Sequence, residues 1–420
     1  MINLPRKLDA EIIQTNNLSN RFKTENDGNP ELRARFIDSS TGHLWGFLVV
    51  DNTKRGPGVG GIRFAQNLSL EEIGRLAYAM TLKNSAACLP FGGAKAGLVV
   101  NPVLMIKEPK LKSEIIHLFA EALFPFENYI SAPDMGTTEY DIQHIYEFNS
   151  KMLGTSMHMR GGAGRESSRG GVPIDDWQLT AHGLVMAIHT LEKLDFGIKI
   201  KGAHVVIQGF GNVGAPTASK LNAEGAIIVG ASDINVGLWN PAGLDIDELN
   251  RIRKAEGGLS NYDSKTEKRF NSNQVHYMLE APCDILVPAA RPDAINARNA
   301  DRIQCKVILQ GANAPVNKMT EYYLSNRCGV ISLSDFIVNS GGMIGCAVEL
   351  MINTDNDYKK KVKMLGTRLY AERLINETIS KNVKQVISKL TSKNETDTFF
   401  REEALELAQK RLLKPGDNWL

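Results

Sequence analysis

The stretch 203–233 restricts the possible folds of this chain more than any other part of the sequence. An apolar segment, 205–208, leads into Gly209-Phe-Gly-Asn-Val-Gly214, a helical segment follows, and a second apolar segment ends at Asp233. A strand, a glycine-rich turn, a helix and an acid at the end of the next strand are typical of a dinucleotide-binding unit in a doubly wound α/β sheet. The sequence therefore predicts one Rossmann domain that begins near this point.

Each glycine of this turn has its own expected role. Gly209 allows the tight turn, Gly211 lets the pyrophosphate approach the backbone, and Gly214 lets the helix pack closely on the strand. The helix N-terminus then faces the pyrophosphate charge. Asp233 should bind the ribose hydroxyls and repel a 2′-phosphate, which favours NAD over NADP. The candidate coenzyme residues in this unit are Gly209, Gly211, Asn212, Val213, Gly214 and Asp233.

Three later apolar segments, 284–288, 306–310 and 329–332, predict further buried strands. Each is followed by small or polar residues, and the carboxyl ends of strands face the coenzyme crevice in such a sheet. The residues predicted at this crevice are Ala289, Ala290, Asn313 and Asn339.

Two glycine clusters lie earlier in the chain. Lys95 stands in the stretch 89–97, which predicts a turn that opens into a buried strand at 98–100. Burial disfavours an ammonium ion, so we expect a lowered pKa and an amine that can act as a base. The alternative is a solvated lysine in an ordinary turn. The other cluster, 56–61, predicts either a hairpin turn or a close approach of a small molecule to Gly60 and Gly61.

Two more polar residues follow predicted secondary structure. A helix should begin at the capping box Ser69-Leu-Glu-Glu72 and bury an apolar stripe that includes Met80. Lys83 continues this stripe, and it either reaches past the helix end to water or points to a ligand carboxylate. Asp134 follows a short strand at 129–133, where it either binds its own backbone or belongs to an active site.

The 420 residues predict two domains. Residues 1–182 would form an α/β substrate and oligomerisation domain, 183–344 the Rossmann domain, and helices within 345–420 would pack back on the first. The loop 158–173, rich in glycine and arginine, is expected to be mobile and solvated, although its arginines could meet a phosphate or an acid.

Composition excludes several other classes of protein. The formal net charge of +2 gives no reason to expect a nucleic-acid or membrane partner, and no apolar run approaches the roughly 20 residues that cross a bilayer. The N-terminus lacks the apolar core of a signal peptide. Five scattered cysteines without a CxxC pair fit a reducing cytoplasm, and the eight dispersed histidines predict no metal site.

Seven motifs together carry a resemblance to a known family. They are Gly60-Gly-Ile-Arg-Phe, Met80-Thr-Leu-Lys-Asn, Pro90-Phe-Gly-Gly-Ala-Lys-Ala-Gly, Ala132-Pro-Asp-Met-Gly-Thr, Gln208-Gly-Phe-Gly-Asn-Val-Gly, Gln310-Gly-Ala-Asn and Asn339-Ser-Gly-Gly. In this order they resemble the glutamate/leucine/phenylalanine/valine dehydrogenases over nearly the whole chain. The resemblance implies reversible oxidative deamination of an L-amino acid to a 2-oxo acid and ammonia, in a homo-oligomer.

The resemblance also implies roles for single residues. Lys83 would bind the substrate α-carboxylate, Lys95 would activate water, and Asp134 would shuttle protons to and from the amino nitrogen. Thr180 would contact the nicotinamide amide, and Asn339 would lie at the substrate. These roles fit the chemistry, because hydride leaves Cα only when the amine is neutral.

Two departures from the glutamate branch concern the substrate side chain. Val59 stands where that branch has a lysine, and Cys346 stands where it has a serine. A side-chain carboxylate without partners in a dry pocket would be costly. We therefore expect an apolar substrate, as for leucine, valine or phenylalanine. The alternatives are a glutamate dehydrogenase with a rearranged pocket and a non-catalytic nucleotide-binding protein on the same fold.

Overall fold

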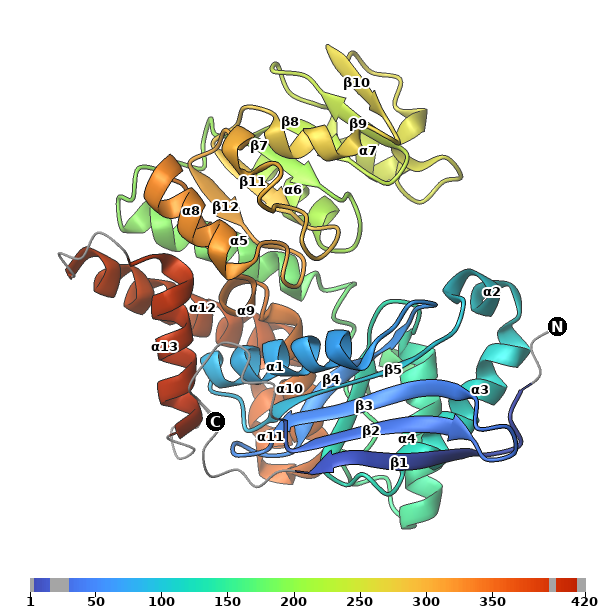
Figure 1. Ribbon diagram of the computed structural model, residues 1–420. Helices are drawn as coiled ribbons and strands as arrows, with labels where there is room; N and C mark the ends of the chain where they lie inside the picture. Colours follow the sequence, from blue (N-terminus) through green and yellow to red (C-terminus); the bar gives the residue numbers. More distant parts are fainter. Residues whose placement is uncertain (1–3, 16–29, 393–397, 414–420) are drawn as a thin grey trace. The chain divides into compact units, whose positions relative to one another are not determined.

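The computed structural model describes residues 4–15, 30–392 and 398–413, and these form two compact units (Figure 1). The first unit takes the described residues up to Ile174, then Met343–Tyr370 and the described residues from Ala408. The second takes Asp175–Gly342 and the described residues from Ala371 to Leu407. The division after Ile174 lies eight residues before the predicted boundary at 182, and the division after Gly342 lies near the predicted 344.

The first unit is built on a six-stranded mixed sheet in the order β1-β2-β3-β5-β4-β6. The strands are β1 (Leu8–Thr15), β2 (Leu32–Asp38), β3 (Leu44–Asn52), β4 (Gly58–Phe64), β5 (Gly92–Leu98) and β6 (Tyr129–Pro133). β4 pairs in parallel with β5 and β6, and the other neighbours are antiparallel. Both early glycine clusters, predicted as turns, lie largely within central strands.

The reason for this difference is steric. An added Cβ on Gly60 would lie 1.7 Å from the Ala94 carbonyl oxygen, and one on Gly92 would lie 1.8 Å from the Asn52 carbonyl oxygen. Glycine is therefore needed here for the close approach of neighbouring strands rather than for chain reversal.

Alternating side chains direct the two faces of this sheet to different helices. Phe47 and Val49 pack with residues of α1, and Leu48 and Val50 belong to the larger core that includes residues of α3 and α4. The helices of this part are α1 (Leu70–Ala86), α2 (Pro102–Lys107), α3 (Pro109–Leu123) and α4 (Glu139–Leu153). The predicted helix start at Ser69 is confirmed by a side-chain cap, and α4 likewise begins at a capping box of Thr138 and Asp141.

The second unit contains a seven-stranded sheet in the order β10-β9-β8-β7-β11-β12-β13. The strands are β7 (His204–Gln208), β8 (Ile227–Ser232), β9 (Val236–Trp239), β10 (Lys268–Asn271), β11 (Ile285–Pro288), β12 (Val307–Leu309) and β13 (Ile331–Leu333). Five strands are parallel, and β9 and β10 form an antiparallel edge. The helices are α5 (Leu179–Lys193), α6 (Gly214–Ala223), α7 (Ile246–Ile252), α8 (Lys318–Cys328) and α9 (Asp335–Val338). The predicted doubly wound sheet is confirmed.

The C-terminal helices are shared between the units, which corrects the expectation that all of 345–420 packs on the first. They are α10 (Gly341–Thr354), α11 (Asn356–Leu365), α12 (Thr367–Ser392) and α13 (Phe400–Leu413). Most of α12 packs on α5, because Asn376 bonds His182, Ser380 bonds Thr190 and Ile379 lies against Gly183. The apolar residues of α12 are buried from Ile375 to Ile387, but Leu369 and, in α11, Leu365 are exposed.

No helix in the described part of the chain combines the length and apolar character that crossing a membrane requires.

Candidate active site

Lys95 lies in the middle of β5 rather than in the predicted turn. Its side chain is buried, with 5% of the residue exposed. Gly93 makes this possible on the α1 side, because an added Cβ there would lie 2.1 Å from the Thr81 amide nitrogen. Gly61 lies beside the ammonium, since its added Cβ would be 3.0 Å from Lys95 Nζ and 2.7 Å from Asp134 Cβ. The two adjacent strands thus leave a small space around the lysine.

Asp134 joins Lys95 to a second cation. Asp134 Oδ2 lies 2.8 Å from Lys95 Nζ and accepts a 2.9 Å hydrogen bond from Arg63 Nε. Arg63 also donates through Nη1 to Glu72 Oε1 at 2.9 Å. The Asp134 carboxylate therefore binds these two cations, while in its turn the Asp134 N–H donates to Thr137 Oγ1 at 2.9 Å and the Thr137 N–H donates to the Asp134 carbonyl at 3.0 Å.

The electrostatics of this group follow from burial and from its neighbours. Burial lowers the pKa of Lys95, although the Asp134 carboxylate opposes that shift. Burial alone would raise the pKa of Asp134, but Lys95 and Arg63 outweigh it and hold this pKa well below its usual range. The predicted desolvated lysine with a lowered pKa is confirmed. Asp134 is an ionised acceptor at neutral pH.

Lys83 is buried in the last turn of α1, with 6% of the residue exposed. The neighbouring Asn84 donates to the Gly92 carbonyl at 2.6 Å, which joins this helix end to the start of β5. A cation at a helix C-terminus is favoured by the backbone carbonyls. The side chain does not extend into bulk water, which was one of the two expectations for Lys83.

Both positions at which the sequence departs from the glutamate branch are buried in the first unit. Val59 is fully buried in β4, and Cys346 is 4% exposed in α10. Both side chains are small and uncharged, and their place at the substrate stays a prediction.

The loop 158–173 differs from the mobile, solvated segment that its composition predicts. Arg165 is 2% exposed, and its Nε lies 2.9 Å from Glu349 Oε1 in α10. The same carboxylate accepts from the backbone N–H groups of Gly164, Arg165 and Val172. Burial raises the pKa of Glu349, which Arg165 opposes. Glu349, from a helix distant in sequence, thus binds several groups of the loop. A loop arginine therefore meets an acid, which was the alternative to a solvated loop.

The glycines of the Rossmann turn have separate steric roles, as predicted. Gly209 has φ +92°, and an added Cβ would lie 2.8 Å from Ala290 Cβ. An added Cβ on Gly214 would lie 1.9 Å from the Gly209 carbonyl oxygen. Gly211 has no atom within 4 Å of an added Cβ. Its open side fits the space that a pyrophosphate needs at the N-terminus of α6.

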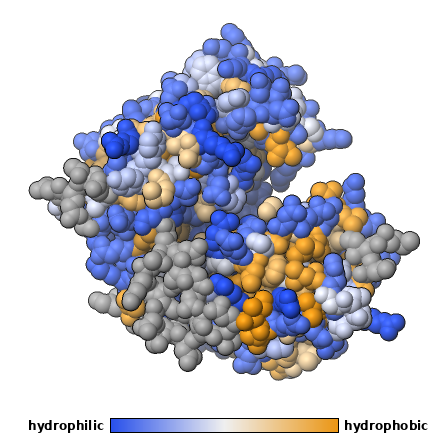
Figure 2. All heavy atoms as spheres, in the orientation of Figure 1, coloured by the Kyte–Doolittle hydropathy of each residue, from blue (hydrophilic) through white to orange (hydrophobic). Residues whose placement is uncertain are grey.

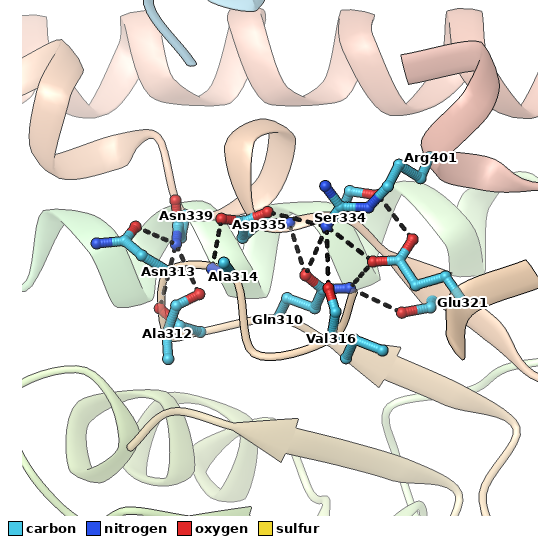
Figure 3. Close-up of polar contacts among 12 residues, drawn as sticks. Gln310, Ala312, Asn313, Ala314, Val316, Glu321, Ser334, Asp335, Asn339 and Arg401 are labelled. Carbon is cyan, nitrogen blue, oxygen red and sulfur yellow. Dashed lines mark hydrogen bonds and ion pairs between the residues drawn. The ribbon is translucent and has the colours of Figure 1, made fainter. Parts of the chain in front are cut away.

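The other predicted coenzyme residues lie around this turn. Ala289 and Ala290 directly follow β11, which pairs with β7 where the strand order reverses, and Gly311 lies close to Ala289 and Val213. Asn339 Nδ2 donates to the Gly311 and Ala312 carbonyls and to Asn313 Oδ1 (Figure 3). Thr180 lies beside Gly341, two residues after Asn339.

Asp233 stands at the end of β8, and its carboxylate is held by backbone groups. Oδ1 accepts from the N–H groups of Asn235 and Val236, and Oδ2 accepts from Leu259 N at 2.8 Å. Oδ1 therefore accepts two hydrogen bonds already, whereas Oδ2 accepts one and can accept a second from a ribose hydroxyl. Asn212, in the glycine turn, donates to Asp175 at 2.8 Å.

Family models match most of the described chain. The Glu/Leu/Phe/Val dehydrogenase dimerisation domain matches residues 32–151, and the Glutamate/Leucine/Phenylalanine/Valine dehydrogenase model matches residues 170–415. The chain belongs to this dehydrogenase family. It is an NAD(P)-dependent oxidoreductase that acts on the CH–NH2 group of an amino acid.

Relatives of this dehydrogenase are named glutamate dehydrogenases. The Thermotoga maritima enzyme is 34% identical over 74% of this chain and 74% of its own. The NADP-specific enzyme of Saccharolobus shibatae is 32% identical over 79% and 78%. A catabolic NAD-specific enzyme of Bacillus subtilis is 32% identical over 74% and 72%. The hetero-hexameric glutamate dehydrogenase of Thermus thermophilus, in its leucine-bound form, shares the fold with a TM-score of 0.76, 24% identity and coverage of 98% and 89%.

Sequence reasoning about the dehydrogenase missed two residues of these clusters, Arg63 and Glu349. Arg63 was visible as a charged residue within the apolar strand that follows Gly60-Gly61, a position that requires a partner. Glu349 lies between apolar residues of α10 in the same way. The partners themselves, 71 and 184 residues away in sequence, have no local signal.

Proposed function

We propose that this dehydrogenase catalyses the reversible oxidative deamination of L-glutamate to its 2-oxo acid and ammonia. The observation that carries the proposal is the buried Lys95–Asp134–Arg63 cluster in a chain whose curated relatives are named glutamate dehydrogenases. Val59 and Cys346 favour an apolar substrate instead, so a glutamate dehydrogenase with this sequence needs a rearranged side-chain pocket.

The cluster supplies the proton chemistry of deamination. Asp134 is ionised, so it can take the proton of the substrate ammonium and leave a neutral amine. Asp134 returns this proton to the amino nitrogen when ammonia leaves, which restores the ionised carboxylate that its low pKa favours. Lys95, whose pKa is lowered by burial, activates the water that attacks the imino carbon. Arg63 holds Asp134 in place for both steps.

The remaining groups bind and orient. Lys83, buried at the end of α1, binds the α-carboxylate, as the family resemblance implies. In the second unit the turn 209–214, Ala289, Ala290, Thr180 and Asn313 hold the coenzyme, and Asn339 lies at the substrate. When bound, the nicotinamide dinucleotide supplies the hydride acceptor.

A glutamate side chain needs a donor in place of the lysine that Val59 replaces. Arg165 is the candidate, because its buried Nη2 has no acceptor among the described residues. Arg165 also meets Glu349, which stands three residues after Cys346 on α10 and therefore lies on the same face of that helix. A substrate carboxylate could accept the hydrogen bond that Nη2 lacks.

The second candidate function is the same reaction with an apolar amino acid, and Val59 and Cys346 favour it. Both are buried and neither offers a charge. An unpaired carboxylate beside them would cost about 1–3 kcal/mol or more. Leucine, valine and phenylalanine are therefore the competing substrates.

Substrate kinetics separate the two candidates. We would compare kcat/KM for glutamate, leucine, valine and phenylalanine with each dinucleotide. A preference for glutamate supports the proposal, and a preference for an apolar amino acid replaces it with the second candidate. The variant Val59→Lys/Cys346→Ser provides the control, because it should raise kcat/KM for glutamate and lower it for leucine.

We further propose NAD as the preferred coenzyme, since the Asp233 carboxylate would repel a 2′-phosphate. The relatives include both NAD-specific and NADP-specific enzymes. If Asp233 sets this preference, Asp233→Ser should lower the NAD to NADP ratio of kcat/KM. We place the enzyme in the cytoplasm as a homo-oligomer, for which the scattered free cysteines and the matched dimerisation domain are the support.

A further inference from the structure

One guanidinium in the second unit lies among buried carboxylates far from it in sequence. Arg401, at the start of α13, places Nη2 2.9 Å from Glu321 Oε1 and 3.3 Å from Asp335 Oδ1 (Figure 3). All three residues are buried, with 7%, 1% and 3% of each exposed. Burial raises the pKa of Glu321, and the charge of Arg401 opposes this shift. The guanidinium therefore helps to keep Glu321 ionised.

These acids hold the loop that follows β12. Asp335 Oδ2 accepts from the Ala314 backbone N–H at 2.8 Å, and the Asp335 N–H donates to Gln310 Oε1 at 3.1 Å. The Gln310 amide group donates to Glu321 and to Ser332 Oγ. Gln310 and Ala314 are the two ends of the segment that contains Gly311 and Asn313. Gln310 is thus bonded to Glu321 and Asp335, and Ala314 is bonded to Asp335.

The conformation of Ala314 shows that this bonding is needed. Its φ is +48°, a left-handed conformation that residues with a side chain rarely adopt. Such a conformation persists only where the surroundings fix it, and the Asp335 carboxylate is the acceptor that fixes the Ala314 N–H. If the Asp335 side chain turned away, this hydrogen bond would be lost.

The middle of the same loop lies at the proposed coenzyme site. Asn339 holds the Gly311 and Ala312 carbonyls, and Gly311 packs against Ala289 and Val213. The order of contacts therefore runs from Arg401 to Asp335, from Asp335 to Ala314, and from the loop to the coenzyme.

We propose that Arg401 is a positioning residue for the coenzyme loop 311–314, through its ion pair with Asp335. It touches neither the coenzyme nor the amino acid in this arrangement. The inference rests on the proposed coenzyme site, and it adds a residue of the C-terminal helix to the groups that set dinucleotide affinity.

The test is to measure the Kd of NADH and NADPH by fluorescence titration without amino acid, and then kcat and KM for both substrates. Arg401→Met should raise the coenzyme Kd and KM at least tenfold and change the amino-acid KM less than twofold. Arg401→Lys should recover part of the affinity, because it restores the charge without the planar fork.

If Arg401 only stabilised α13, loss of another ion pair of this helix should raise the coenzyme Kd equally. Lys389→Met removes the ion pairs that α13 makes through Glu403 and Glu406, without touching the loop. It should lower the thermal midpoint and leave the coenzyme Kd unchanged. An equal rise of Kd in Lys389→Met, or an unchanged Kd in folded Arg401→Met, would overturn the proposal.

A second variant covers the case in which Arg401→Met does not fold. Arg401→Met/Glu321→Gln removes one positive and one negative charge, so the net charge of the cluster is kept while Asp335 still loses its cation. This variant should show the same rise in Kd. If the unaltered protein binds neither dinucleotide, the proposed function fails as well, and that outcome is distinct from unaltered binding by the variants.

Discussion

At the scale of single residues, the buried Lys95 and Asp134 make the most specific forecast. Lys95→Met should lower kcat by between about 100- and 10,000-fold, the usual contribution of a positioned acid or base. The coenzyme Kd should stay unchanged, because the bonded partner of Lys95 is Asp134 within the first unit. Steady-state kinetics and dinucleotide titration on the same preparation provide both numbers.

A matched control exists in the same unit. Lys112 of α3 pairs with Asp141 of α4 and is also largely buried, but both residues lie in helices rather than in the strands that hold the Lys95 cluster. Lys112→Met should lower stability and leave kcat near that of the parent. If both variants lose turnover equally, the loss comes from destabilisation and the catalytic role of Lys95 is wrong.

The lowered pKa of Asp134 has a consequence for stability. A carboxyl group whose pKa falls on folding stabilises the protein above its unfolded pKa, near 3.8, and this stabilisation is lost as the pH falls towards the folded value. The thermal midpoint of the parent should therefore exceed that of Asp134→Asn most above pH 5. The corresponding difference in the free energy of unfolding should shrink between pH 4 and pH 3, by about 1.4 kcal/mol per pH unit at most. A difference that grows on acidification would contradict the assigned direction.

At the scale of elements, two glycines of the strand–turn–helix β7–α6 should affect coenzyme binding and protein stability separately. Gly211 has open space where a Cβ would go, and its φ is not in the left-handed region, so Gly211→Ala should leave the thermal midpoint unchanged. The same methyl would occupy the approach of the pyrophosphate, so the dinucleotide Kd should rise at least tenfold. Gly214→Ala should instead lower the midpoint, because its Cβ would lie 1.9 Å from the Gly209 carbonyl oxygen. The reverse pattern would show that Gly211 does not face the coenzyme.

In the loop 158–173, the Glu349 side chain accepts hydrogen bonds from Gly164, Arg165 and Val172. Glu349→Gln would leave Arg165 buried without an anion, which should cost about 3–5 kcal/mol. The loosened loop should then be cut by trypsin after Arg165 under conditions that leave the parent intact. Glu147→Gln, which removes the exposed pair with Arg169, is the control and should not change the cleavage pattern. Equal resistance of both variants would mean that packing alone holds the loop.

At the scale of the whole molecule, local patterns predicted the elements better than their partners. The sequence 203–233 contains its complete structure locally, so strand, turn, helix and acid were all predicted. The stretches 56–61 and 89–97 were predicted as turns, because glycine serves both chain reversal and close strand contact, and only the pairing of β4 with β5 decides between them. The amphipathic pattern of α12 gave its buried face from Ile375 onward but not the unit on which it packs.

The catalytic cluster shows the same division between local and distant information. Lys95 and Asp134 were identified from their motifs, but Arg63 joins them only because β4 lies between β5 and β6 in the folded sheet. Arg401 has no local signal at all, since its acids lie 80 and 66 residues earlier in the chain. Long-range ion pairs are therefore the part of the site that requires coordinates.

The assembly is the last property that the sheet of the first unit predicts. β1 is an edge strand of this sheet, and among the described residues it pairs on one side only, with β2. Ile12 and Ile13 on it are 58% and 50% exposed, and hydrophobic residues gather over this part of the unit in Figure 2. An exposed apolar edge is a common site of association, and the matched model for residues 32–151 is named a dimerisation domain.

We therefore expect the parent protein to sediment at a multiple of its 46.2 kDa chain mass, and Ile12→Lys/Ile13→Lys to sediment as a smaller species. The added ammonium groups would have to be buried without partners in the interface, which is strongly unfavourable. Ile106→Lys is the matched control, because Ile106 is an exposed isoleucine of the same unit that lies in α2, away from the edge strand. Analytical ultracentrifugation of the three proteins at several concentrations measures the difference. An unchanged mass in the β1 variant would place the contacts of the assembly on another surface, whereas dissociation of this variant alone would identify β1 as part of the interface between copies.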